Sequence, residues 1–158
     1  MAYQILLNVI LALIWMFLTT KATPAAFIIG YLIGLIIMYI FRRFFSTRFY
    51  MHRAVAMVKL LLIFIRELFV ANFDVFKIIT RPKLELSPGI FSYETGLTAE
   101  WQITLLANLI TLTPGTLVID ISPDNKVLYI HSMNIGEIHE MKDAIKNSFE
   151  KAILEVTE

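Results

Sequence analysis

The first 41 residues of this 158-residue chain contain a single charged side chain, Lys21. Two apolar segments, 5–18 and 25–41, flank a short polar break that ends at Pro24. The second segment supplies 17 helical residues, or about 25 Å at 1.5 Å per residue, the short end of what crosses the hydrocarbon core of a bilayer, and the first is slightly shorter. Because the break between them is so short, the pattern predicts an antiparallel membrane hairpin.

A secretory signal peptide is the competing interpretation of the first apolar segment. It is disfavoured because no Lys or Arg precedes the apolar run, and because a second apolar run follows closely. In that second run, Gly30 and Gly34 lie four residues apart, a spacing that lets another helix approach closely. They form a candidate helix-packing face, although glycine is also common in membrane helices generally.

Basic residues follow the second apolar segment directly. Arg42, Arg43, Arg48 and Arg53 come with no acidic residue among them, which marks the cytoplasmic side of a membrane. Aromatic neighbours could suggest nucleic-acid binding, but the position beside the bilayer favours anionic lipid headgroups as the partner. The sequence therefore predicts a multi-pass protein of the cell membrane, with its N-terminus and its C-terminal part in the cytoplasm.

Charge divides the chain into parts. Residues 1–82 carry nine basic and two acidic side chains, a net charge of +7, whereas residues 83–158 carry five basic and eleven acidic ones, a net charge of −6. This asymmetry predicts a domain boundary. We expect a hairpin with a basic turn at 1–53, a linking helix at 54–82 and a small cytoplasmic domain at 83–158.

The linking helix is apolar over 54–79 but has one charged stripe. At 100° per residue, the charges of the stripe fall within a sector about 80° wide; they belong to Lys59, Arg66, Asp74, Lys77 and Arg81. Such a stripe is typical of a helix lying in the membrane interface. The alternative is a third membrane span whose stripe faces a partner subunit. In either case Lys59, Arg66 and Glu67 are candidates for inter-subunit or ion-linked charges.

The C-terminal part predicts a small α+β domain. Strands are expected at 89–95, 116–122 and 126–132, a helix that is apolar on most sides at 98–112, and an amphipathic helix from 138 to the end, in the order β-α-β-β-α. The apolar helix is expected to be buried, in our preferred interpretation by a partner. In the second strand, Leu117, Ile119 and Ile121 alternate and are expected to share one face. The predicted fold class is a membrane helical hairpin, an amphipathic linking helix and this small cytoplasmic domain.

Signals for catalysis are poor throughout the sequence. The chain has no cysteine, no glycine-rich phosphate loop, no nucleophile elbow and no paired-histidine zinc helix. We therefore predict no catalytic, cofactor-binding or metal-binding residues, and we do not expect an enzyme.

Several motifs together resemble one known family. Arg66-Glu67-Leu68, Ala71-Asn72 and above all the stretch from Thr111 to His131 are similar to the E subunit of Mrp-type multisubunit cation/proton antiporters. The resemblance implies a small accessory component of a hetero-oligomeric membrane complex that exchanges cytoplasmic Na⁺ for external H⁺, with other subunits as its partners. It also marks a hallmark turn, which is expected to be structural and consists of Thr113, Pro114, Gly115 and Thr116.

Two functions remain open from the sequence. The first is an accessory and assembly subunit of such a Na⁺/H⁺ antiporter, because two short spans without a carboxylate cannot form an ion pathway alone. The alternative is a membrane-tethered regulatory domain that senses a small ligand for a transporter.

Overall fold

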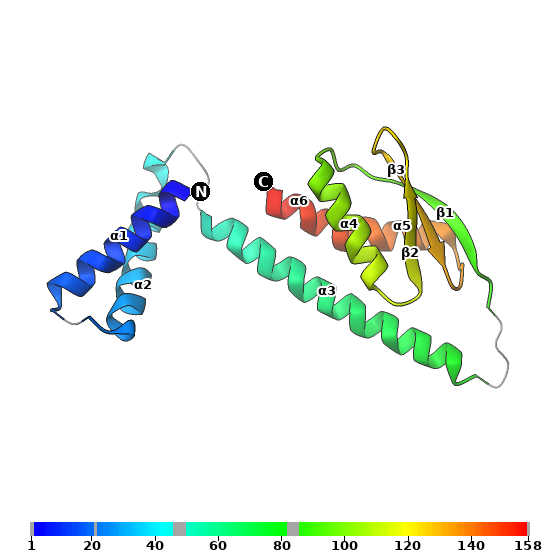
Figure 1. Ribbon diagram of the computed structural model, residues 1–158, viewed down its shortest axis with the longest axis horizontal. Helices are drawn as coiled ribbons and strands as arrows, with labels where there is room; N and C mark the ends of the chain where they lie inside the picture. Colours follow the sequence, from blue (N-terminus) through cyan, green and yellow to red (C-terminus); the bar gives the residue numbers. More distant parts are fainter. Residues whose placement is uncertain (1, 21, 46–49, 82–85, 158) are drawn as a thin grey trace. The chain divides into compact units, whose positions relative to one another are not determined.

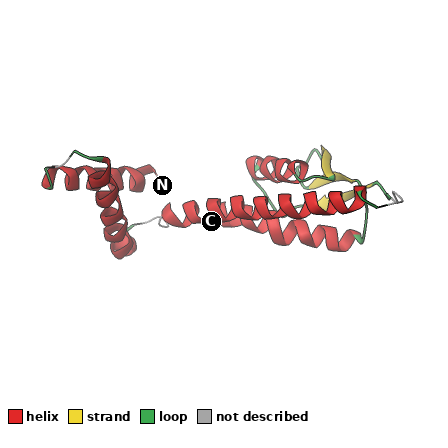
Figure 2. Ribbon diagram, turned by 90° about the horizontal axis from the view of Figure 1, so that it is seen from below, coloured by secondary structure: helices red, strands yellow, loops and turns green. Residues whose placement is uncertain are grey.

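The computed structural model describes residues 2–20, 22–45, 50–81 and 86–157. These residues belong to two compact units, Met1–Val55 and Ala56–Glu158. The first unit is helical, whereas the second combines helices with one small sheet (Figures 1 and 2).

Two helices of equal length, α1 (Ala2–Leu18) and α2 (Pro24–Ile40), pack against each other in the first unit, and the short 3-10 helix η1 (Phe41–Phe44) follows. The start of α2 is well defined because the Thr23 hydroxyl accepts a hydrogen bond from the Ala26 N–H at 3.2 Å. In the described part of the chain, Pro24–Phe44 is the one helical stretch both long and apolar enough to cross a membrane; α1 is a shorter apolar helix. The insertion of both helices into a bilayer stays a prediction.

A single helix of 30 residues, α3 (Tyr50–Ile79), comes next. It begins four residues before the predicted start at 54, because the Tyr50 N–H finds an acceptor in the Gln4 side chain at 2.8 Å. From Ala56 onward α3 belongs to the second unit, where Ala56 and Leu60 join the hydrophobic core. In this unit α3 runs alongside the remaining elements (Figure 2).

The rest of the second unit follows the order β-α-β-β-α (Figure 1). Its elements are β1 (Gly89–Glu94), α4 (Glu100–Leu112), β2 (Thr116–Ile121), β3 (Val127–Ser132), α5 (Ile138–Ile145), the π-helical turn η2 (Lys146–Glu150) and α6 (Lys151–Thr157). The last three elements follow one another without a break. The strands form an antiparallel sheet in the order β1-β3-β2.

One face of the sheet contributes to the core of the second unit. Alternate residues of β1 and β3, namely Phe91, Tyr93, Leu128 and Ile130, are buried together with apolar residues of α4 and α6. The other face is open, and Ile90 on it is 60% exposed. The helices therefore pack against one side of the sheet, as expected for a two-layer α+β unit.

The predicted shared face of β2 is wrong. The register of β2 against β3 shifts between Val118 and Asp120, which is the signature of a β-bulge. One extra residue breaks the alternation of period two, so Val118 and Ile121 pack against the core. Leu117 and Ile119 are instead 45% and 48% exposed.

Candidate functional site

The turn between α4 and β2 is closed by its own threonines. The Ile110 carbonyl accepts hydrogen bonds from the Thr113 hydroxyl at 2.6 Å and from the Thr116 hydroxyl at 2.8 Å. Thr113 is extended (ψ 127°), as a residue before proline must be, and Gly115 has a φ of +93°, which favours glycine. Thr113, Gly115 and Thr116 therefore each have a local structural reason for their identity.

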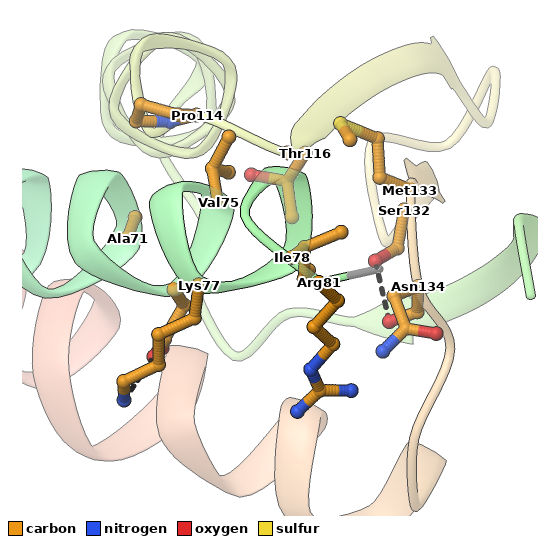
Figure 3. A pocket seen from close by; sticks show the side chains of 12 residues that line it. Ala71, Val75, Lys77, Ile78, Arg81, Pro114, Thr116, Ser132, Met133 and Asn134 are labelled. Atoms are coloured by element: carbon orange, nitrogen blue, oxygen red, sulfur yellow. Dashed lines mark hydrogen bonds and ion pairs between the residues drawn. The ribbon is translucent and has the colours of Figure 1, made fainter. Parts of the chain in front are cut away.

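This turn faces α3 across a cleft. A cavity of about 450 Å³ lies between them and is lined by Val75 and Ile78 of α3, by Arg81 just after α3, and by Pro114 and Thr116 of the turn (Figure 3). A second cavity, of about 230 Å³, lies between α3, the turn, α5 and η2, with Glu67 in its wall. In Figure 3, Lys77 and Arg81 extend away from Pro114 and Thr116, on the other side of α3.

The three candidate charges on α3 do not form one cluster. Lys59 donates to Glu155 of α6 at 2.5 Å, and Arg66 pairs with its neighbour Glu67. The Glu67 side chain is 25% exposed, whereas the Arg66 side chain is 69% exposed. Lys59 thus links α3 to the C-terminal helix, and the Arg66–Glu67 pair stands separately beside the smaller cavity.

Gly30 and Gly34 lie on the side of α2 that faces α1. A Cβ at Gly30 would lie 2.8 Å from the Trp15 Cβ and 2.9 Å from the Ala12 carbonyl oxygen. A Cβ at Gly34 would overlap the Asn8 side-chain oxygen. The later glycine meets the earlier part of α1, so the helices run antiparallel, and both glycines permit the close approach.

A buried polar cluster in the first unit was not predicted from the sequence. Asn8 Nδ2 donates to the Tyr50 hydroxyl at 2.8 Å, and this hydroxyl lies 2.8 Å from that of Tyr31. Within the described residues Asn8 Oδ1 has no N–H or O–H donor, but it lies where a hydrogen on the Gly34 Cα points, the geometry of a weak Cα–H···O bond. The sequence does contain one indication of this cluster, because Gln4 and Asn8 are polar residues one turn apart on an otherwise apolar helix.

A buried carboxylate in the second unit was also missed. Glu150 is 4% exposed, and its carboxylate accepts hydrogen bonds from the Tyr93 hydroxyl at 2.7 Å, the Thr95 hydroxyl at 2.9 Å and the Gly96 N–H at 3.1 Å. Burial and the hydrogen bond to Glu150 raise the pKa of Tyr93 above its usual value. The π-helical turn η2 adds a residue to the helix and turns both Phe149 and Glu150 inward. Periodicity alone does not reveal such a turn.

The basic residues after α2 are only partly described. Arg42 lies over the Tyr39 ring, 4.6 Å from its centroid, and Arg43 belongs to η1. Arg53 lies in the first turn of α3, whereas Arg48 lies outside the described residues. Across the described ranges, no group of three or more His, Cys, Asp or Glu side chains is arranged to hold a metal ion.

Comparison with known proteins decides the family. Residues 8–156 match a family of Na⁺/H⁺ ion antiporter subunits. The chain belongs to this family. It is 52% identical over 157 residues, 99% of both chains, to the E subunit of the Na⁺/H⁺ antiporter of Bacillus subtilis (strain 168). It is 46% identical over 157 residues, again 99% of both chains, to the corresponding E subunit of Alkalihalophilus pseudofirmus.

A solved structure resembles this antiporter-family chain over its full length. It is a chain in the structure of the membrane-bound sulfane sulfur reductase, an archaeal respiratory membrane complex, with 27% identity, a TM-score of 0.56 and 99% of each chain covered. The resemblance to the antiporter family that was inferred from the motifs is thereby confirmed, and with it a location in a membrane.

Proposed function

We propose that this chain is an accessory and assembly subunit of a multisubunit Na⁺/H⁺ antiporter in the cell membrane. The observation that carries the proposal is the full-length similarity to the E subunit of the Bacillus subtilis antiporter. The chemistry of the helices supports an accessory role, because α1 and α2 contain no charged residue. Ion exchange needs ionisable groups in the pathway, so the pathway is assigned to other subunits.

We propose a topology of two membrane helices, in which the start of α1 and the end of α2 both lie on the cytoplasmic side. Because α1 and α2 run antiparallel, the start of α1 and the end of α2 lie at the same end of the pair. Arg42 and Arg43 directly follow α2, and basic residues mark the cytoplasmic side. We therefore propose that the N-terminus and the second unit lie in the cytoplasm, with anionic headgroups near the basic residues.

The turn Thr113–Thr116 is assigned a structural role in this proposal. Its hydroxyls are bonded to the Ile110 carbonyl and to each other, and so are not arranged to receive a substrate. It closes α4 beside α3 and thereby shapes the surface that the second unit offers to neighbouring subunits. A small-ligand sensor is less well supported, because Lys77 and Arg81 at the larger cavity point away from the turn (Figure 3).

The pair Arg66–Glu67 is proposed to be a structural or inter-subunit ion pair. Replacement of Glu67 by Gln should lower antiport activity only mildly, because a partly exposed pair contributes about 0–1 kcal/mol. Na⁺-dependent proton efflux from inverted vesicles measures this effect. Complete loss of antiport in a complex that still assembles would instead assign Glu67 to the ion pathway.

Purification tests the proposed function directly. The tagged chain, expressed with its native partners and extracted in a mild detergent, should co-purify with the other antiporter subunits in a particle much larger than the 18.2 kDa monomer. Its deletion should reduce the amount of assembled complex. Recovery of the chain alone, as a monomer or homodimer, would overturn the proposal.

A further inference from the structure

One side of α3 is apolar along its length and exposed. Six side chains between 39% and 73% exposed follow one another along the helix at intervals of three and four residues, namely Val58, Leu62, Ile65, Phe69, Phe73 and Phe76. We call them the α3 apolar stripe. With Met57 and Ile79 on its flank, the exposed apolar sector is about 160° wide at 100° per residue. Asn72 is the one polar residue in this sector, and its amide bonds the Leu68 carbonyl at 2.7 Å.

The opposite side of α3 meets its own unit near both ends of the stretch from Ala56 to Ile79. Ala56 and Leu60 belong to the core cluster, and Lys59 pairs with Glu155. Further along, a Cβ at Gly115 would lie 3.7 Å from Val75, so the 113–116 turn contacts α3 there. The part of the chain that covers α3, residues 83–158, carries sixteen charged side chains.

This packing argues against a membrane-crossing α3. A helix that crosses the bilayer would carry the attached unit into the hydrocarbon region, where every charged side chain is expensive. To avoid this, α3 would have to separate from the unit and expose Ala56, Leu60 and their core partners to water. If α3 lies parallel to the membrane plane, neither cost arises, because its apolar side enters the lipid while the side that packs on the unit stays in water with it.

The width of the exposed sector decides between lipid and a partner helix. A single partner helix covers a seam about 100° wide or less, whereas a bilayer surface covers a whole half of a helix. The charges agree with this choice, because Lys59, Arg66 and Lys77 stand at one border of the apolar sector, the level of the headgroups for a helix in the interface. Each of the three is paired with an acidic side chain there.

We infer that α3 lies in the plane of the cytoplasmic membrane surface with the α3 apolar stripe inserted among the lipid acyl chains. The inference rests on the proposed function for its choice of the cytoplasmic side. It adds a specific partner, an anionic lipid surface, to a helix that the sequence leaves open. Residues 83–158, with their net charge of −6, then stay in the aqueous phase beside the membrane. The insertion of α3 keeps them there despite repulsion by anionic headgroups.

Neighbouring residues on α3 provide the test, since the native chain has no cysteine. Single cysteines replace both members of three pairs, Val58/Lys59, Ile65/Arg66 and Phe73/Asp74, and each receives a nitroxide label. The labelled full-length chain is reconstituted in vesicles of phosphatidylethanolamine and phosphatidylglycerol, alone and within the co-purified complex. Accessibility to lipid-soluble oxygen and to a water-soluble nickel chelate reports the depth of each label.

If α3 lies in the membrane plane, the two labels of every pair should differ in depth in the same direction. The apolar member should have an oxygen-to-nickel accessibility ratio several-fold above that of its charged neighbour, and the three apolar members should share one depth. A spanning helix predicts nearly equal depths within a pair, which differ by only about 1.5 Å along the axis, and three different depths between pairs. That pattern would overturn the inference.

Two other results would also overturn it. Labels at 58, 65 and 73 that are shielded from both reagents in the complex would show that a protein partner covers the stripe. Labels that are open to the nickel chelate in vesicles would show that no membrane does. Failure to co-purify with antiporter subunits affects the proposed function alone, because the depth pattern is also measured on the isolated chain.

Discussion

Removal of the buried Glu150 carboxylate should destabilise the second unit more than the loss of any surface charge. Glu150→Ala deletes the acceptor for three donors, which are the hydroxyls of Tyr93 and Thr95 and the N–H of Gly96. Tyr93 is only 3% exposed, so water reaches its hydroxyl poorly after the change. These donors lie at the end of β1 and in the loop after it, whereas Glu150 lies in η2, so the contact holds two distant segments together.

The size of the effect follows from the donors left without an acceptor. Each buried group without a partner raises the free energy of folding by about 1–3 kcal/mol. With at least Tyr93 and Gly96 affected, Glu150→Ala should reduce the free energy of unfolding by about 3 kcal/mol. For a unit of this size, 1 kcal/mol corresponds to about 4–8 °C in Tm, so a fall of about 12–24 °C is expected.

Thermal unfolding of the full chain in detergent measures this fall. Trp101 lies in α4 of the second unit, so its fluorescence in a Trp15→Phe background reports on that unit alone. Glu150→Gln keeps the shape and one acceptor oxygen, and the hydroxyls can rotate to accept from its amide, so a loss of about 1 kcal/mol is expected. Glu94→Ala, at an exposed position of β1, is the matched control and should change little.

A double-mutant cycle adds the decisive comparison. Tyr93→Phe removes one donor to the carboxylate. In this background Glu150→Gln should therefore reduce the free energy of unfolding less than it does in the wild type. If Glu150→Ala unfolds within a few degrees of the control, the carboxylate does not hold these segments together, and the reasoning is refuted.

Three further outcomes are expected. Gly34→Ala should separate α1 from α2 and reduce the amount of assembled complex on a native gel, whereas Ile36→Ala, at a position 61% exposed, should not. Thr113→Val should lower complex assembly and leave Na⁺ preference unchanged, since it removes a hydroxyl bound to the Ile110 carbonyl; altered selectivity in an intact complex would contradict this. Because the pKa of Tyr93 is raised in the folded state, its hydroxyl contributes stability below its ordinary pKa of 10.0 and progressively less as the pH rises above it. Chemical denaturation should therefore show the difference between wild type and Tyr93→Phe shrinking above that pH, and a constant difference would exclude the linkage.

Local patterns in the sequence were enough for the elements themselves. The apolar runs 5–18 and 25–41 become α1 and α2, and alternation and turn residues locate the strands of the sheet. These properties depend on residues a few positions apart, so hydrophobic periodicity and proline or glycine punctuation predict them. The same local motifs around Thr113–Thr116 were sufficient to identify the family.

Contacts between distant residues were decided only by the tertiary structure. Asn8 meets Tyr50 across 42 positions, and Glu150 meets Tyr93 across 57, so no periodicity links either pair. The bulge in β2 follows from its register with β3 and reverses the face expected for Leu117 and Ile119. For α3, the sequence determined a helix with one charged stripe. Which of its apolar sides lies in the core, and which stays free for a membrane, depends on where the second unit packs.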